Sequence, residues 1–325
     1  MNDLFEIRSP GFCHWIKAQW GIDPKRVRPE FDIQGSPERT LSLCVMEDDL
    51  GRLFLVEKFP PQKFPIRHQV SRTIDHLNNE GLEAALACEK TIAGQYLPFY
   101  GQACFQVTRF LDSTGVERPG WLSDAQMGAS MADFLVRMDA ASGHILEEIS
   151  FSPFSIKTYI LQLFSEMRIH DTEMYDRYAP FLAFLEQEFM DAHDRLPLKF
   201  CHGDFHPLNV IWNHFQIRAV IDWEFTGLKP DMYDAANLVG CAGIENPDGL
   251  AMPMVTTFLS RIRSAGIISD LGWHYFPEYI LALRFAWLSE WLRKKDREML
   301  DMEAAYMDIL VRHMDRLREI WEINR

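Results

Sequence analysis

The sequence predicts an α+β fold with two lobes, because strand patterns dominate its first third and helical patterns dominate the remainder. Short apolar runs bounded by turn residues mark the front of the chain, and apolar residues spaced three and four apart mark the back. Short strand patterns near residues 198–222 interrupt the helical region. We therefore expect a strand-rich domain over residues 1–111 and a helix-rich domain over residues 112–325.

A β-hairpin is the first regular element we expect, after an irregular or helical lead-in over residues 1–30. The segments LSLCVM (41–46) and RLFLVEKF (52–59) have the composition of strands, and the acidic turn EDDLG lies between them. The segment PPQKFP (60–65) ends the hairpin.

One helix and one further strand complete the expected front domain. A helix is predicted from about residue 67 to residue 79, since Val70, Ile74 and Leu77 fall on one face. Residues 103–111 predict a strand, and DSTGVERPG (112–120) reads as the linker to the back domain.

The back domain is expected to be mostly helical. Ser123 is the predicted N-cap of a helix whose apolar periodicity runs from Met127 to Met138. The other elements expected here are helices over residues 152–190, strands at 198–202, 208–213 and 217–222, and helices from about residue 231 to the end.

Composition limits the class of protein. The chain is 47% hydrophobic and 25% charged, with a formal net charge of −14, which argues against nucleic acid or an anionic membrane as a partner. The charge is compatible with a cationic substrate, although many proteins are simply acidic. We find no signal-peptide core, no apolar run of about 20 residues and no CxxC pair among the six cysteines. These features predict a cytoplasmic protein without a disulfide framework, and they leave the oligomeric state open.

Two carboxylates and an amide lie beside predicted strands in the stretch from residue 200 to residue 227. Asp204 and Asn209 fall on the loop between two short strands, and Asp222 ends a third strand. Hard oxygen ligands of this kind suit Mg²⁺, which is usually completed by water and substrate phosphate. A carboxylate that does not bind metal can instead take the proton of a hydroxyl group. Phosphoryl transfer from ATP needs both functions.

The motifs in this stretch resemble a known family. The segment HGDFHPLNV has the H-x-D-x-x-x-x-N spacing of a protein-kinase catalytic loop, and IDWE follows with its aspartate 18 residues after Asp204. Together with the downstream GLKPDMYDAANLV, the pattern resembles the aminoglycoside phosphotransferase and choline kinase family. The resemblance implies a bilobal, protein-kinase-like fold that uses ATP and Mg²⁺ as cofactors.

The resemblance also implies roles for individual residues. It makes Asp204 the catalytic base and gives the Mg²⁺ ligands as Asn209 and Asp222. The supporting roles would fall to His202, which braces the loop, His206, which orients it near Asp204, and Asp234, which holds it from the next helix. Both histidines have the alternative of being packed, satisfied core residues. A zinc site formed by Cys201 and the neighbouring histidines fits no zinc-ligand spacing.

Nucleotide contacts are expected from the front domain. Lys58 alternates in phase with the apolar Phe54 and Val56, and a lysine there needs an anionic partner, for which ATP phosphate is suitable. Its alternative is a strand-end lysine that reaches water. A phosphate-covering turn is expected at Gly35 and Ser36, with a plain surface turn as the alternative.

Two further features of the front domain concern the nucleotide. The position of the strand at residues 105–111 suggests that its backbone binds adenine, at Gln106, Val107, Thr108 and Arg109. The helix after the hairpin departs from the kinase pattern, because it has no central glutamate to pair with the strand lysine. Asp75 is the nearest acid and Glu80 lies at the end.

An acceptor pocket is expected among the C-terminal helices. Residues 273–294 are rich in aromatics on a helical pattern, and aromatic and acidic side chains together suit an amine. The candidates are Glu278, Tyr279 and Trp287, with Glu224 as a further pocket residue or a ligand of a second metal. The alternatives are helix packing for the aromatics and a solvated acid for Glu224.

We therefore expect an ATP-dependent phosphotransferase that moves the γ-phosphate to a hydroxyl of a small molecule. The acceptor could be an amino-alcohol, a sugar, homoserine or an aminoglycoside-like compound, and the fold does not choose among them. Two alternatives stay open: a protein Ser/Thr kinase of the same fold, and a non-catalytic nucleotide-binding regulator.

Overall fold

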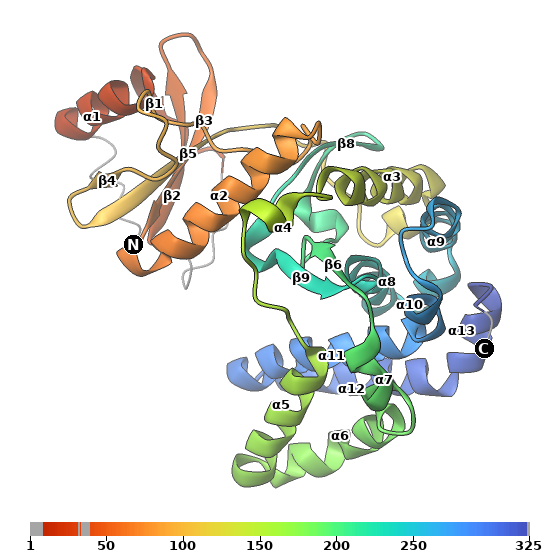
Figure 1. Cartoon of the computed structure of the whole chain (residues 1–325). Helices are drawn as coiled ribbons and strands as arrows, with labels where there is room; N and C mark the ends of the chain where they lie inside the picture. Colours follow the sequence, from red (N-terminus) through yellow and green to blue (C-terminus); the bar gives the residue numbers. More distant parts are fainter. Residues whose placement is uncertain (1–8, 32, 34–39, 324–325) are drawn as a thin grey trace. The chain divides into compact units, whose positions relative to one another are not determined.

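The computed structural model describes residues 9–31, 33 and 40–323, and the chain divides into two compact units (Figure 1). The front unit comprises Met1–Thr114 and Ala219–Glu224, and the back unit comprises Gly115–Arg218 and Phe225–Arg325. The first unit break therefore lies three residues after the predicted boundary at residue 111. The short return of residues 219–224 to the front unit was not expected from the sequence.

The front unit contains a five-stranded antiparallel sheet with the order β1-β2-β3-β5-β4. The strands are β1 (Pro24–Val27), β2 (Ser42–Asp48), β3 (Leu53–Phe59), β4 (Phe99–Tyr100) and β5 (Ala103–Arg109). The predicted hairpin is confirmed as β2 and β3, with Ser42 opposite Lys58 and Glu47 opposite Leu53. The predicted strand 103–111 is β5, whereas the short edge strands β1 and β4 were not predicted.

Two helices cover the two faces of this sheet. Helix α1 (Pro10–Trp20) packs Phe12, Ile16 and Trp20 against one face, where Phe54 and Val56 of β3 are buried. Helix α2 (Phe64–Asn79) lies on the other face, where its Phe64 packs beside a small core. That core consists of Phe59, Leu97 and Cys104. Helix α2 begins three residues earlier than predicted, because Pro65 occupies the first turn, where its missing N–H is not needed.

The back unit is mostly helical (Figure 1). Its helices are α3 (Ala125–Ala141), α4 (Ile145–Glu148), α5 (Ile156–His170), α6 (Thr172–Leu185), α7 (Phe189–Ala192), α8 (Tyr233–Glu245), α9 (Pro253–Ala265), α10 (Asp270–His274), α11 (Phe276–Lys294), α12 (Arg297–Arg312) and α13 (Met314–Ile320). Ser123 is wrong as the N-cap of α3. Asp124 caps it instead, since its carboxylate accepts from the amides of Gln126 and Met127.

Two small ladders carry the strands expected near residue 200. Strand β6 (Leu198–Cys201) pairs with β9 (Gly227–Pro230), and β7 (Val210–Asn213) pairs with β8 (Gln216–Val220). Strand β9 was not predicted, because its sequence GLKP combines a glycine and a proline. The strand predicted at 217–222 ends at Val220, so Asp222 lies in the segment that follows it.

A buried ion pair joins α11 to α12. The Nη2 of Arg284 donates to Glu303 Oε2 at 2.8 Å, and both side chains are almost completely buried. The indole Nε1 of Trp291 donates to the same oxygen at 3.3 Å, and the Arg284 guanidinium lies 5.3 Å from the Tyr306 ring. In the described part of the chain, no helix is both long and apolar enough to cross a membrane.

Candidate active site

Hydrogen bonds connect the loop after β6 to the first turn of α8. One carboxylate oxygen of Asp234 accepts from the amide of His202 at 2.7 Å, and the other accepts from the amide of Gly203 at 2.8 Å. His202 is fully buried, and its Nδ1 accepts from the amide of Asp204 at 3.2 Å. These hydrogen bonds fix the backbone that carries Asp204, and the bracing roles of His202 and Asp234 stay a prediction.

Gly203 is required by the shape of this loop. Its φ angle is +89°, a region that residues with a side chain rarely adopt. A Cβ atom at this position would lie 2.1 Å from the carbonyl oxygen of Phe225 and 2.8 Å from Cε of Lys229. The loop therefore turns tightly against the start of β9, and only glycine fits.

The carboxylate of Asp204 is fixed from two sides. The Nδ2 of Asn209 donates to Asp204 Oδ2 at 3.0 Å and to the Asp204 carbonyl at 2.8 Å. The Nε2 of His206 lies 3.5 Å from Asp204 Oδ1 and 3.2 Å from Asn209 Nδ2. Because the amide nitrogen of Asn209 faces Asp204, its amide oxygen is the atom that suits a metal ion. The structure thus brings together Asp204, His206 and Asn209.

Electrostatics differ between Asp204 in the loop and Asp234 in α8. Burial raises the pKa of Asp204, but the hydrogen bond and charge of His206, the charge of His202 and the hydrogen bond from Asn209 outweigh it, so the pKa lies below its usual value. Burial raises the pKa of Asp234 to about 6, although the amides of Gly203 and His202 oppose the shift. Asp204 is therefore ionised at neutral pH, as a proton acceptor must be.

Thr226, Asn237 and Lys229 lie at the loop and were not predicted as site residues. The hydroxyl of Thr226 donates to the Cys201 carbonyl at 2.8 Å, and Asn237 Nδ2 donates to the Phe205 carbonyl at 3.3 Å. Lys229 is buried beside Gly203, with its Nζ 5.1 Å from the ring centroids of Phe154 and Tyr233. No sequence signal marks Lys229, since it lies in the strand that was not predicted.

In the front unit, Asp222 has a strained backbone. Its φ angle is +60°, which is uncommon for a residue with a side chain and is typical of functional sites. Two residues later, the side chain of Glu224 is 7% exposed. It forms ion pairs with Lys63 Nζ at 3.4 Å and with Arg67 Nη2 at 3.8 Å. Glu224 is therefore neutralised by two cations of its own unit, and the alternative of a solvated acid is wrong.

Glu57 is an acid that sequence reasoning missed. It lies on the sheet face covered by α2, two residues before Phe59, and is half-buried. Burial raises its pKa, the charge of Arg67 lowers it, and the charges of Asp222 and Glu224 raise it again. Alternation along β3 could have revealed Glu57, because it is in phase with Leu55 and Phe59.

Lys58 lies on the opposite sheet face from Glu57. It is in phase with Phe54 and Val56, which are buried in the core beneath α1, and it stands opposite Phe105 of β5. The alternation predicted for Lys58 is thus present. The face that it shares is the one covered by α1, however, and not the one that carries Glu57 and α2.

The other nucleotide contacts expected in the front unit have different outcomes. Gly35 and Ser36 lie outside the described residues. The segment from Gln106 to Arg109 is the end of β5, and its backbone is already paired with β3. The carbonyl of Val107 accepts from the amide of Glu89 at 2.7 Å, and Thr108 bridges Cys88. Part of this backbone is therefore already hydrogen-bonded within the front unit, and adenine binding by Gln106 to Arg109 stays a prediction.

The expected acceptor residues on α11 are engaged in packing. Tyr279 has no exposed surface and packs against Phe189 and Tyr233. Glu278 forms an ion pair with Arg318, whose other amine donates to the His274 carbonyl. Trp287 is half-buried and its ring stacks on Trp291 at 6.0 Å. The alternative of helix packing therefore describes Tyr279 better than a ligand wall does.

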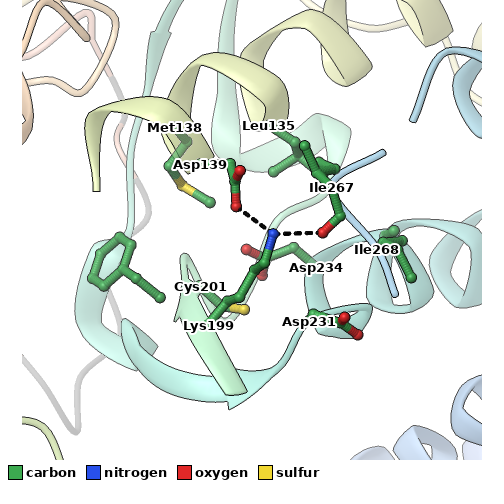
Figure 2. Close-up of a pocket in the computed structure, with 11 residues that line it drawn as sticks. Leu135, Met138, Asp139, Lys199, Cys201, Asp231, Asp234, Ile267 and Ile268 are labelled. Carbon is green, nitrogen blue, oxygen red and sulfur yellow. Dashed lines mark hydrogen bonds and ion pairs between the residues drawn. The ribbon is translucent and has the colours of Figure 1, made fainter. Parts of the chain in front are cut away.

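A small cavity lies behind the loop, and Figure 2 shows its lining. Its volume is about 20 Å³, enough for one water molecule but not for an acceptor substrate. The Nζ of Lys199 donates to Asp139 Oδ1 at 2.8 Å and to the Ile267 carbonyl at 2.7 Å (Figure 2). The Oδ1 of Asp231 is buried without a hydrogen-bond partner among the described residues, so a bound water would satisfy it.

Comparison with known proteins identifies the class. Residues 44–265 match the model of the phosphotransferase enzyme family, a span that includes β3, the loop at residues 202–209 and α8. The chain belongs to this family and is a phosphotransferase of the kinase type. Among curated proteins, none matches.

Solved structures share the fold at low sequence identity. An aminoglycoside phosphotransferase from Alicyclobacillus acidocaldarius is 14% identical with a TM-score of 0.67, over 97% of this chain and 98% of that one. An amicoumacin kinase in complex with AMP-PNP, Ca²⁺ and amicoumacin is 12% identical with a TM-score of 0.65, over 95% and 96%. A spectinomycin phosphotransferase in complex with ADP and spectinomycin is 14% identical with a TM-score of 0.58, over 96% and 97%. The predicted protein-kinase-like α+β fold is confirmed.

Proposed function

We propose that this protein transfers the γ-phosphate of ATP to a hydroxyl group of a small molecule. The observation that carries the proposal is the fixed loop from His202 to Asn209, in which an ionised Asp204 is held by His206 and Asn209. Membership of the phosphotransferase family supports the reaction class. The nucleotides bound in the amicoumacin kinase and the spectinomycin phosphotransferase support a nucleoside phosphate as the donor.

Asp204 acts as the base in this proposal. Its carboxylate accepts the proton of the acceptor hydroxyl while that oxygen bonds to the γ-phosphorus. The bond from the γ-phosphorus to the β–γ bridging oxygen breaks, and ADP leaves. The low pKa of Asp204 keeps the carboxylate ionised at neutral pH, and its two hydrogen-bonding neighbours keep it in one orientation.

Asn209 and Asp222 are the proposed oxygen ligands of Mg²⁺. The donor set fits the metal, because an amide oxygen and a carboxylate are hard ligands, and the positive φ of Asp222 is the kind of backbone strain that is common at functional sites. When bound, Mg²⁺ would neutralise charge on the transferring phosphoryl group. The acceptor is proposed to be a small hydroxyl compound, and the antibiotics named for the similar structures are reasonable members of the first test panel.

The first experiment is mass spectrometry of a metabolite extract and an antibiotic panel incubated with Mg·ATP and the protein. We expect one compound to gain a phosphoryl group with the wild type and not with Asp204→Ala. Binding of Mg·ATP to the variant should be largely preserved, because Asp204 is assigned to the acceptor and not to the nucleotide.

The same experiment separates the two alternatives. Phosphate that appears on protein Ser/Thr residues and on no small molecule would favour the protein-kinase alternative. Tight Mg·ATP binding without any transfer would favour the non-catalytic regulator, against which the complete set of Asp204, Asn209 and Asp222 argues.

A further inference from the structure

Charged groups are crowded on the α2 face of the front sheet. The charges of Asp222 and Glu224 act on Glu57 there, and Lys63 and Arg67 form ion pairs with Glu224. These groups are far from fully solvated, since the Glu224 side chain is only 7% exposed and the Arg67 side chain only 15%. Charges this close to the protein interior need well-defined partners.

Arg67 has unused hydrogen-bonding capacity in this cluster. Its guanidinium carbon lies 4.3 Å from the centroid of the Phe59 ring, which places the group against this face of the sheet. Its ion pair with Glu224 is long, at 3.8 Å, and its Nε is buried without a hydrogen-bond partner among the described residues. A guanidinium has five N–H donors, and buried ones are normally satisfied. The geometry leaves donors that suit a bound oxyanion.

We propose that Arg67 is the cation of the front unit that contacts the nucleotide phosphates, and that Glu57 and Glu224 hold its guanidinium in place. This assignment rests on the proposed function, since it takes a nucleoside phosphate as the ligand. It reverses the kinase pattern, in which a lysine on the strand binds phosphate and a glutamate on the helix supports it. Here the strand carries the acid and the helix carries the cation.

The same strand explains why Lys58 is not chosen. Lys58 points to the face with Phe54 and Val56, which α1 covers, whereas Glu57 shares its face with Arg67 and experiences the charge of Asp222. Asp222 is the proposed metal ligand, and the phosphates bound by that metal would lie on its side of the sheet. Arg67 is therefore the better placed of the two cations.

The test compares ligands that differ only in phosphate content. Calorimetry with ATP, ADP and adenosine, each with Mg²⁺, is carried out on the wild type and on Arg67→Met. We expect Arg67→Met to lose about tenfold or more in affinity for ATP and ADP, the change expected when one charge-assisted hydrogen bond is lost, and to keep its affinity for adenosine. Two variants serve as controls: Lys58→Met on β3, and Arg72→Met at an exposed position of α2, the helix that carries Arg67. Both should retain the wild-type preference for phosphate.

Each other outcome has a defined meaning. The assignment is overturned if Arg67→Met prefers ADP over adenosine as strongly as the wild type does. It is also overturned if Lys58→Met, and not Arg67→Met, loses this preference. In both cases the proposed function stands. A wild type that binds none of the nucleotides overturns both. If thermal melting shows that Arg67→Met does not fold, Arg67→Lys is tested instead, because it keeps the charge but lacks the planar guanidinium. An unchanged preference of this variant for phosphate over adenosine contradicts the proposal. An intermediate loss of the preference supports it.

Discussion

The amide nitrogen Nδ2 of Asn209 donates hydrogen bonds to both the carbonyl and the carboxylate of Asp204, at 2.8 and 3.0 Å. One residue thus fixes the backbone and the side chain of the proposed base. The same residue supplies the oxygen that the proposal assigns to Mg²⁺. Base orientation and metal binding are therefore coupled through a single amide group.

Asn209→Ala is expected to impair both functions at once. We predict that kcat falls by about tenfold to a hundredfold, as for other residues that orient a ligating or catalytic group, and that the Mg²⁺ concentration for half-maximal activity rises. Asn213→Ala, at the exposed end of β7, is the matched control and should leave both quantities unchanged. A fall in kcat with an unaltered Mg²⁺ requirement would remove Asn209 from the metal site.

Gly203→Ala is expected to destabilise the loop by steric overlap. The added methyl would meet the Phe225 carbonyl at 2.1 Å at a φ of +89°, so the free energy of unfolding should fall by about 3 kcal/mol or more, with loss of activity. Gly266→Ala is the control, because Gly266 also has a positive φ, of +67°, but no atom within 4 Å. That variant should lose only about 1 kcal/mol. Equal losses in urea denaturation would mean that the close approach is unimportant.

The loop could be predicted from the sequence because its information is local. Asp204 and Asn209 lie five residues apart, and the loop between two short strands limits where their side chains can go. The contact with Asp234 is more distant in the chain, yet it follows from the family pattern at the start of α8. Motif spacing was therefore enough to predict that Asp204, Asn209 and Asp234 meet around one loop.

The front-unit site could not be predicted in the same way. Period-two alternation correctly separates Glu57 from Lys58, but it does not tell which sheet face a distant helix will cover. Helix α1 ends more than twenty residues before the hairpin of β2 and β3 and was expected only as an irregular or helical lead-in, so its packing on the Lys58 face had no signal. The contact between Arg67 and Phe59 depends on the same tertiary choice.

The buried pair of Arg284 and Glu303 should be strongly coupled. Glu303→Leu would leave the guanidinium of Arg284 buried without its carboxylate partner, and Arg284→Met would leave the carboxylate of Glu303 buried without its cation. Each is expected to cost about 3–5 kcal/mol of unfolding free energy. The double variant should cost far less than the sum, since it removes both charges together. Urea denaturation of the four proteins measures the coupling, and additive losses would show that the two charges act independently.

Stability should respond to the protonation of Asp234 in an unusual direction. Its pKa is raised from 3.8 to about 6 in the folded protein, so the folded state favours the protonated carboxyl. The contribution of this group to stability is present in full below pH 4 and is lost as pH rises through about 6, which amounts to roughly 3 kcal/mol for a shift of about two units. Asp234→Asn cannot titrate and lacks this decline. The difference in unfolding free energy between variant and wild type should therefore change in favour of the variant between pH 4 and pH 6 and be constant above about pH 7. A difference that is independent of pH across this window would show that Asp234 is ionised throughout, with its charge fully supported by the amides of His202 and Gly203.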